Sequence, residues 1–527
     1  MPNVSGPVRR TGVLAATIMA SSMAFIDGSV VQIALPAVQR DLGADFASLQ
    51  WVVGFYNLML GALVLVGGAL GDAVGRRRVF LAGTLVLVAS SLACGLAPSA
   101  PVLVAGRAVQ GVGAALMIPQ SLALIAATHP EEIRGRAIGT WAAASALTTA
   151  FGPPVGGFMV DALSWRAAFL VNLPVGLVAL WMTLRFVPES RAEPARPVDW
   201  VAGLLAAAGL GALTAALIHA PGHGLADPSV LAGLALAAVA LPAFLAWEAR
   251  AAAPMVPLGL FRNRAFALLN LLTLLLYGAL SGALFVVPYT LVGLGGYGAA
   301  EAGTAMLPMA LAIGLLSRSF GALSDRVGAR PLLALGSAVV AASMLWLAAT
   351  GTGGGLWVGV VGPLLGIGFG MAMVVSPLTT AVMTAIGDAL SGTASGINNA
   401  AARVAGLLAV AVTGALAVAL YAPRLAAGLA AAGLEPAVTA GLLAEADRLL
   451  DLPALASLPE PSRTTAETSV RAAYLYAFTL AVAANAALAG LAAVVALWLP
   501  RSVPVSDRSA KAVTPSNRSE HQPGGEL

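Results

Sequence analysis

The sequence predicts an all-α polytopic membrane protein with fourteen transmembrane helices, and two observations carry this prediction. Hydrophobic residues make up 59% of the 527 residues and charged residues only 10%, whereas soluble domains contain roughly 25% charged residues. Apolar stretches also repeatedly exceed the roughly 18 residues that cross a ~30 Å hydrocarbon layer as a helix. Because so few charges cannot cover a soluble surface, the composition argues against a soluble enzyme, a nucleic-acid-binding protein and a disordered scaffold.

The predicted spans are apolar segments, several of them interrupted by the Gly and Pro that membrane helices tolerate. The first span follows Arg9 and Arg10, as a signal peptide would, but it is too long for that role and has Asp27 in its middle. The fourteen spans are 12–35, 47–70, 79–97, 102–126, 137–160, 166–187, 201–218, 230–247, 265–289, 302–322, 331–349, 357–383, 399–421 and 473–498.

Basic residues predict the orientation of these spans. An even number of spans places both termini on one side, and most of the 28 Lys and Arg residues, Arg403 among them, then lie on that side. By the positive-inside rule this side is the cytoplasm, so we expect a multi-pass protein of the cell membrane with both termini cytoplasmic. The basic residues form no amphipathic patch, so the net charge of +4 indicates topology and no nucleic-acid partner.

Cysteine and histidine usage predicts neither a disulfide nor a metal site. Cys94 is the single cysteine, and it lies in an apolar run that indicates a buried thiol. His219 and His223 are four residues apart, but Pro221 and Gly222 between them predict a loop instead of a helical metal pair.

A ten-residue segment occurs twice. GALGDAVGRR at 68–77 recurs as GALSDRVGAR at 321–330, and both copies lie between two spans on the predicted cytoplasmic side. A duplication explains this pattern: two equivalent six-helix halves, with two extra helices inserted between them. Secondary transporters have such repeats, and their sites lie between the halves near the bilayer midplane. The predicted domains are an N-terminal half at 12–187, a linker with the two extra helices at 188–264, a C-terminal half at 265–498 with an extracytoplasmic loop at 422–472, and a disordered cytoplasmic tail at 499–527.

Five motifs follow one another along the chain. They are 25–36 in the first span, 68–77 after the second, 103–113 in the fourth, 152–157 in the fifth and 165–174 at the start of the sixth. On these residues the chain resembles the major facilitator superfamily, in particular its fourteen-span drug:proton antiporters, which export drugs and antibiotics. The resemblance implies the major facilitator fold, transport by alternating access and a monomeric protein.

Asp27 is the one acid predicted in the middle of a span. An ionised carboxylate is costly in an apolar wall, so these surroundings favour the neutral form and suit a group that exchanges protons. We expect Asp27 to bind a proton, a cationic substrate, or each in turn, the alternative being a structural carboxyl. Arg107 lies in the fourth span with Gln110 on nearly the same face. The resemblance implies that Arg107 takes part in proton coupling, and a structural brace is the alternative.

The first copy of the duplicated segment forms a short charged turn, in which one glycine permits close helix approach and a second permits the turn itself. The resemblance implies that this loop latches the two halves in one access state, while a solvated basic loop is the alternative. The second copy is weaker because it lacks the run of three arginines. The latch residues are Gly68, Asp72, Gly75, Arg76 and Arg77 in the first copy, and Asp325 and Arg330 in the second.

A Gly/Pro cluster in the fifth span lets the helix kink or pack tightly. The resemblance implies that this cluster marks an antiporter, and a purely packing role is the alternative. Its residues are Gly152, Pro153, Gly156 and Gly157. Polar residues in several spans are candidates for lining a substrate cavity or for bonding a neighbouring helix. These are Asn57, Gln110, Gln120, Asn270 and Tyr277.

Together these features predict a proton-coupled antiporter that exports hydrophobic or cationic drug-like or antibiotic molecules across the cytoplasmic membrane. Export of an endogenous secondary metabolite or siderophore is the alternative, and a non-transporting receptor or channel is a more distant one. An enzyme is not expected, because four scattered His and one Cys provide no convergent catalytic groups. The expected partners are a small hydrophobic or cationic substrate, protons and membrane lipid. No cofactor is expected, and without a Walker A motif the proton gradient is the expected energy source.

Overall fold

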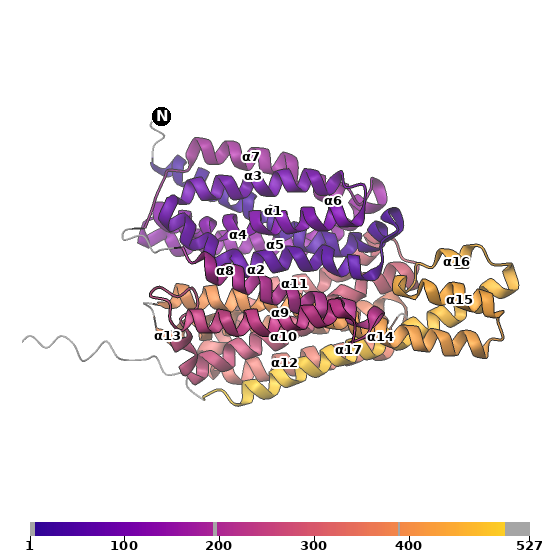
Figure 1. Ribbon diagram of the computed structural model, residues 1–527. Helices are drawn as coiled ribbons and strands as arrows, with labels where there is room; N and C mark the ends of the chain where they lie inside the picture. Colours follow the sequence, from indigo (N-terminus) through magenta and orange to yellow (C-terminus); the bar gives the residue numbers. More distant parts are fainter. Residues whose placement is uncertain (1–5, 193–197, 352, 388–389, 501–527) are drawn as a thin grey trace, which may run out of the picture.

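The computed structural model describes residues 6–192, 198–351, 353–387 and 390–500, and these ranges fold into helices joined by turns, with no strand among them. The predicted all-α fold class is thereby confirmed. Two bundles of long helices lie side by side, one built from the first part of the chain and one from the later part (Figure 1). Most of the predicted tail at 499–527 lies outside the described residues.

The first bundle contains α1 (Gly6–Leu42), α2 (Phe46–Val74), α3 (Arg76–Gly95), α4 (Ala100–Thr128), α5 (Glu131–Ala162), the single turn α6 (Ala167–Leu170) and α7 (Asn172–Phe186). Glycines bring its helices together. A Cβ at Gly67 of α2 would lie 2.2 Å from the carbonyl oxygen of Ala115 on α4, and one at Gly83 of α3 would lie 2.8 Å from that of Gly113 on α4. Small residues of this kind let helix backbones approach closely in membranes.

The second bundle contains α10 (Arg264–Tyr289), α11 (Ala299–Val327), α12 (Ala329–Thr350), α13 (Gly362–Ile386), α14 (Ser391–Ala431) and α17 (Glu460–Leu497). Short helical turns precede or follow some of these, namely η1 (Leu258–Arg262), η2 (Thr290–Leu294) and η3 (Leu356–Val361). Its helices approach each other as closely as those of the first bundle. A Cβ at Gly336 of α12 would lie 2.7 Å from the carbonyl oxygen of Gly370 on α13.

Two further helices, α8 (Trp200–His223) and α9 (Pro228–Glu248), pack on each other, and α8 also contacts α2 and α14. Asp199 and Asp227 cap them by accepting from backbone N–H groups at 3.0 and 2.8 Å. The loop predicted between His219 and His223 is wrong, because α8 continues to His223. The proline inside it lies in the last turn of α8, where membrane helices tolerate it.

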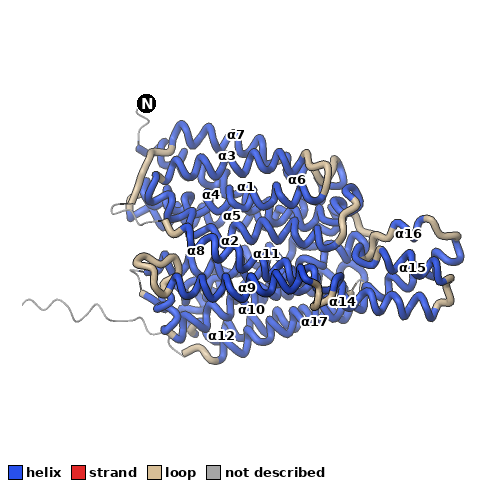
Figure 2. The backbone as a smooth tube through the Cα atoms, viewed as in Figure 1, coloured by secondary structure: helices blue, strands red, loops and turns tan. Residues whose placement is uncertain are grey.

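The two ends of the molecule differ. We call the end where α1 begins and α17 ends the terminal end (Figures 1 and 2). At the other, the loop end, α14 and α17 project beyond the bundles and are joined through α15 (Pro436–Ala444), η5 (Ala446–Arg448) and α16 (Pro453–Ala456). The connection predicted at 422–472 is therefore shorter than expected, because α14 continues to Ala431 and α17 begins at Glu460.

Thirteen helices among the described residues are long and apolar enough to cross a membrane. Each overlaps one predicted span, and the remaining span, 137–160, lies in the 32-residue helix α5. Small and polar residues lower the hydropathy of α5, which packs between α1 and α11. A total of fourteen spans stays a prediction.

Arg403 does not lie where the sequence placed it. We expected this residue on the cytoplasmic side, but it is the thirteenth of the 41 residues of α14. A Cβ at Gly61, the sixteenth of the 29 residues of α2, would lie 3.2 Å from Arg403 Cβ. Arg403 is therefore level with the middle of α2, and its assignment to the membrane surface is wrong.

Candidate functional site

The residues predicted to couple protons meet in the core of the first bundle. Asp27 on α1 and Arg107 on α4 form an ion pair, in which Arg107 Nη1 donates to Asp27 Oδ2. The two side chains are 0% and 1% exposed, respectively. Opposite charges this deeply buried stabilise a protein only if their remaining donors and acceptors are also bonded.

Three polar side chains provide those bonds. Gln110 on α4 accepts from Arg107 Nη1 at 2.7 Å, and its Nε2 donates to Asp27 Oδ1 at 2.8 Å. The same Nε2 donates to Ser91 Oγ on α3 at 2.8 Å. Asn172 on α7 donates to Ser91 Oγ at 3.2 Å and to Asp27 Oδ1 at 3.4 Å. We call Asp27, Ser91, Arg107, Gln110 and Asn172 the polar network.

The far side of Arg107 is held by a carbonyl and an aromatic ring. Its Nε donates to Val52 O at 2.9 Å, and its guanidinium carbon lies 4.3 Å from the centroid of the Tyr56 ring. Tyr56 is itself 2% exposed and donates to Ala24 O at 3.0 Å. The cation–π contact and the carbonyl bond fix the guanidinium in one orientation.

Sequence reasoning identified the two charges but not all of their partners. Gln110 was a candidate for the substrate cavity, whereas the structure places it in the polar network. Asn172 belongs to the sixth-span motif, which was the available signal for it. Nothing marked Ser91 or Tyr56, because a lone polar residue in an apolar span does not reveal which helix it faces.

Of the other four cavity candidates, Asn270 and Tyr277 lie near one cavity of the second bundle, where Asn398, which lines it with Tyr277, donates to Asn270. Gln120 is 1% exposed and donates to a backbone carbonyl of α2 at 2.7 Å. Asn57 donates to a carbonyl of its own helix at 3.2 Å, and Asn270 does so at 2.9 Å. Of these four, Tyr277 borders a cavity, which has a volume of about 110 Å³.

The first latch copy forms the turn between α2 and α3. Gly75 has a φ of 129°, a conformation that favours glycine. Asp72 accepts from Arg76 Nη2 at 2.8 Å and from its Nε at 3.0 Å. Gly68 lies one turn before Asp72, where a Cβ would be 3.7 Å from the side chain of Pro119 on α4.

A carboxylate that the sequence did not suggest braces this turn. Glu189, in the segment after α7, accepts from the backbone N–H of Arg77 at 3.0 Å and lies 3.7 Å from Arg78 Nε. In the same segment, Ser190 O accepts from the backbone N–H of Arg76 at 2.9 Å. These bonds attach the turn to its own bundle.

The second latch copy has the same backbone but different contacts. Gly328, between α11 and α12, has a φ of 82° at the position that corresponds to Gly75. Asp325 and Arg330 border a cavity of about 190 Å³. Within the described residues, no ion pair joins Asp325 to Arg330.

The Gly/Pro cluster lies where α5 crosses two other helices. Gly152 and Gly156 face α1, and a Cβ there would lie 1.9 and 2.5 Å from side-chain atoms of α1. Gly157 and the carbonyl of Pro153 face α11, and a Cβ at Gly157 would lie 2.1 Å from the carbonyl oxygen of Ala299. These residues therefore bring α5 into backbone contact with a helix of the other bundle.

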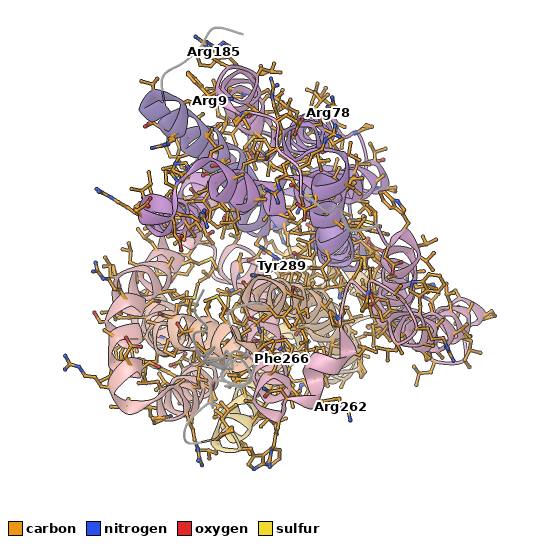
Figure 3. The ribbon with its side chains drawn as sticks, turned by 90° about the vertical axis from the view of Figure 1, so that its left-hand side faces the viewer. Arg9, Arg78, Arg185, Arg262, Phe266 and Tyr289 are labelled. Atoms are coloured by element: carbon orange, nitrogen blue, oxygen red, sulfur yellow. The ribbon has the colours of Figure 1, made fainter. Side chains whose placement is uncertain are left out.

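Hydrogen bonds join the two bundles toward the loop end. Asp161 of α5 accepts from two backbone N–H groups at the start of α11 at 3.1 and 2.8 Å. Gln39 of α1 donates to Arg448 O at 3.0 Å and accepts from the hydroxyl of Tyr289, which lies at the boundary between the bundles in Figure 3. Gln50, near the start of α2, donates to two carbonyls of α14 at 3.1 Å. The bundles are thus tied together at the loop end.

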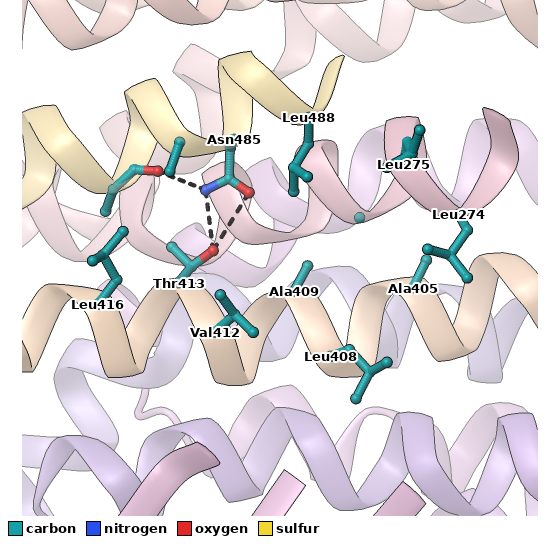
Figure 4. A pocket seen from close by; sticks show the side chains of 13 residues that line it. Leu274, Leu275, Ala405, Leu408, Ala409, Val412, Thr413, Leu416, Asn485 and Leu488 are labelled. Atoms are coloured by element: carbon teal, nitrogen blue, oxygen red, sulfur yellow. Dashed lines mark hydrogen bonds between the residues drawn. The ribbon is translucent and has the colours of Figure 1, made fainter. Parts of the chain in front are cut away.

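A separate apolar cavity of about 220 Å³ lies between α10, α14 and α17 (Figure 4). Its polar lining is the pair Asn485 and Thr413, in which Asn485 Nδ2 donates to Thr413 Oγ1 at 3.0 Å. Leu408 and Val412 border it on α14, whereas Leu407 of the same helix contacts α2. The cavity therefore lies on the side of α14 that faces away from the first bundle, and it contains none of the predicted site residues.

Known proteins resemble this chain over most of its length. The Multidrug resistance protein Stp of Mycobacterium tuberculosis is 36% identical over 407 residues, which cover 76% of this chain and 75% of that protein. The Tetracenomycin C resistance and export protein of Streptomyces glaucescens is 32% identical over 495 residues, or 93% of this chain and 92% of that protein. The Cephamycin export protein CmcT of Amycolatopsis lactamdurans is 36% identical over 76% of this chain and 83% of that protein.

Solved structures share the fold. A bacterial homolog to the human lysosomal transporter Spinster, in an inward-facing and unoccupied conformation, superposes with a TM-score of 0.63 at 16% identity, covering 94% of this chain and 98% of that one. The POT family transporter PepTSo superposes with a TM-score of 0.63 at 14% identity, covering 96% of this chain and 100% of that one. Residues 17–410 match the sequence profile described as Major Facilitator Superfamily. The chain therefore belongs to the Major Facilitator Superfamily.

Proposed function

We propose that this chain is a proton-coupled antiporter that exports drug-like or antibiotic molecules by alternating access. The observation that carries the proposal is the polar network, a buried ion pair bonded by side chains from four helices. The names of the relatives, which refer to multidrug resistance, tetracenomycin C and cephamycin export, support the class of substrate. The superfamily membership supports a transporter rather than an enzyme.

The polar network has two electrostatic states. When Asp27 is ionised, it accepts from Arg107, Gln110 and Asn172, and the ion pair is neutral overall. When Asp27 takes up a proton, its carboxyl group loses its charge and its new O–H points among donors, while the guanidinium loses its counter-charge. The unpaired positive charge favours a different packing of α1 against α4. Proton uptake thereby biases a two-state equilibrium of the helices.

A short path leads from Asp27 to the contact between the bundles. Ser29 and Val30 follow Asp27 on α1 and contact α5 at Gly152 and Gly156. The next glycine of α5 contacts the backbone of α11. A shift of α1 caused by protonation therefore acts on the helix that closes the loop end.

We place the terminal end in the cytoplasm, so that the bonds between the bundles close the outer side of the protein. Basic residues support this orientation, since Arg9, Arg78, Arg185 and Arg262 lie around the terminal end (Figure 3). The proposal also includes the domain division: two halves at 12–187 and 265–498, an inserted linker at 188–264, and fourteen spans in all. It further includes a monomeric protein that needs no cofactor, in which the Asp72–Arg76 turn acts as a latch.

Vesicle transport tests the coupling role of Asp27. We expect everted vesicles to accumulate a coumarin dye when a pH gradient, acidic inside, is imposed, and we expect Asp27→Asn to abolish this accumulation. Asn keeps the shape of the side chain and one of its two acceptor oxygens but cannot exchange the proton. Asp227→Asn, at the exposed cap of α9, is the matched control and should transport like the wild type.

Each outcome of this experiment has a distinct meaning. Equal gradient-driven uptake by wild type and Asp27→Asn contradicts the role of Asp27, but the protein would still be a proton-coupled antiporter. No gradient-driven uptake of any dye by the wild type contradicts proton-coupled drug export itself. Downhill movement alone, with no accumulation, would indicate a channel.

A further inference from the structure

Arg403 is a charged residue in the middle of the membrane-spanning region, and the part of the chain that the structure describes gives it no partner. It lies where α14 meets α2, at the depth of Gly61. Its side chain is half-buried, and within the described residues no hydrogen bond or ion pair engages its guanidinium. A guanidinium at this depth is costly unless it finds an anion, carbonyls or water.

The helices packed around Arg403 contain no carboxylate at its depth. The sequences of α8, α10, α13 and α14 contain neither Asp nor Glu. On α2 the one acid is Asp72, which lies eleven residues from Gly61, or roughly 16 Å along a helix, and is bonded to Arg76. The acids of α17 are in its first turns at the loop end. Asp27 is held by the polar network, so the residues that the structure describes supply no counter-charge to Arg403.

A polar cavity lies beside this charge. It has a volume of about 110 Å³ and is formed by α10, α13 and α14. Asn399, one helical turn before Arg403, lines it, as does Tyr277, the fourteenth of the 26 residues of α10 and so also at mid-depth. Ala402, the residue before Arg403, also lines the cavity, so the backbone of Arg403 adjoins it. The complete lining is Tyr277, Thr379, Val382, Ser395, Asn398, Asn399 and Ala402.

Hydrogen bonds hold part of this lining in place. Asn398 Nδ2 donates to Asn270 Oδ1 at 3.2 Å and to Thr273 Oγ1 at 2.7 Å. Asn270 is 6% exposed and Thr273 is 0% exposed, so the amide of Asn398 is anchored to the core of α10. The wall of the cavity is therefore preorganised, and a ligand needs to order few side chains on binding.

We propose that Arg403 and this cavity bind the carboxylate group of an amphipathic small-molecule substrate. The planar guanidinium matches a carboxylate with two parallel hydrogen bonds, and the amide and hydroxyl groups of the cavity can bond the remaining oxygens of the ligand. This inference rests on the proposed function and defines its substrate class. It replaces the cationic substrate expected from the sequence, because Asp27, the acid on which that expectation depended, is fully buried and paired with Arg107.

The same geometry connects the ligand to the proton site. Arg107 Nε donates to Val52 O of α2 at 2.9 Å, and Gly61 of the same helix faces Arg403. Helix α2 therefore contacts both the charge that binds the substrate carboxylate and the charge that pairs with Asp27. A carboxylate bound at Arg403 adds a negative charge beside this shared helix.

A matched pair of probes tests the proposal on the purified full-length protein. The probes are 7-(diethylamino)coumarin-3-carboxylate and its neutral carboxamide, which differ in charge at one group, and binding is followed by fluorescence anisotropy. We expect the wild type to bind the carboxylate about 10- to 100-fold more tightly than the amide, the range for charge-assisted hydrogen bonds. We expect Arg403→Gln to lose this preference without weakening amide binding, and Arg403→Lys to retain part of it.

Arg424→Gln is the control, since it removes a positive charge from the same helix at a position stacked on Tyr476, and it should bind both probes like the wild type. The proposal is overturned if the wild type shows no preference for the carboxylate, or if Arg403→Gln weakens both probes equally. Binding needs no gradient, so it is separable from the proposed function. If the wild type prefers the carboxylate but shows no gradient-driven flux, antiport alone is contradicted. If it shows gradient-driven flux of cationic dyes only and no preference for the carboxylate, the carboxylate site alone is contradicted.

Discussion

The protein contains two groups of charges deep in its helices, and they are satisfied in opposite ways. Asp27 and Arg107 are almost fully buried, and hydrogen bonds from Gln110 of α4 and Asn172 of α7 complete their ion pair. Arg403 is half-buried at the contact between the bundles and has no partner among the described residues. We call Asp27 and Arg107 the sealed pair and Arg403 the open charge. The charge of the sealed pair changes only when it gains or loses a proton, whereas the open charge can be neutralised by a bound anion.

Breaking the sealed pair should have the largest effect on stability. Arg107→Met leaves Asp27 buried without a counter-charge, and we expect it to lower the free energy of unfolding by about 3–5 kcal/mol. The double variant with Asp27→Leu removes both charges and should recover most of this loss. Unfolding in mixed micelles measures both. A double variant as unstable as Arg107→Met would contradict the account of the pair.

Removing one hydroxyl of the polar network should have an intermediate effect. Ser91 Oγ accepts from Gln110 and Asn172, but both amides also donate to Asp27. We therefore expect Ser91→Ala to cost about 1 kcal/mol of unfolding free energy. Ser90, which bonds only within its own helix, is the matched control position. A loss of unfolding free energy as large as that of Arg107→Met would contradict this prediction, because it would show that the ion pair depends on the Ser91 hydroxyl.

Removing the open charge should have the smallest effect on stability. Because Arg403→Gln breaks no bond among the described residues and removes an unpaired charge, we expect it to raise the free energy of unfolding by less than about 1 kcal/mol, in the same assay. A loss of several kcal/mol would mean that Arg403 has a structural partner, and the contrast between the two groups would then fail.

Long apolar segments made the helices predictable, because hydropathy over some twenty residues is set by the membrane rather than by neighbouring helices. Hydropathy did not predict the contacts of the site residues. Whether Gln110 faces a cavity or Asp27 depends on the rotation of α4 against α1, and the depth of Arg403 depends on its packing against Gly61. Arg403 lies near the start of a predicted span, where hydropathy cannot separate a surface charge from a buried one.

The most direct test of this account separates the two charges in one transport assay. Wild type, Asp27→Asn and Arg403→Gln would be reconstituted in proteoliposomes, with uptake of the coumarin carboxylate and carboxamide measured with and without an imposed pH gradient. The account predicts that Asp27→Asn loses the gradient response while keeping its preference for binding the carboxylate. It predicts that Arg403→Gln loses that preference while its transport of the carboxamide still responds to the gradient. Loss of both properties in each variant would contradict the separation of proton coupling from substrate binding.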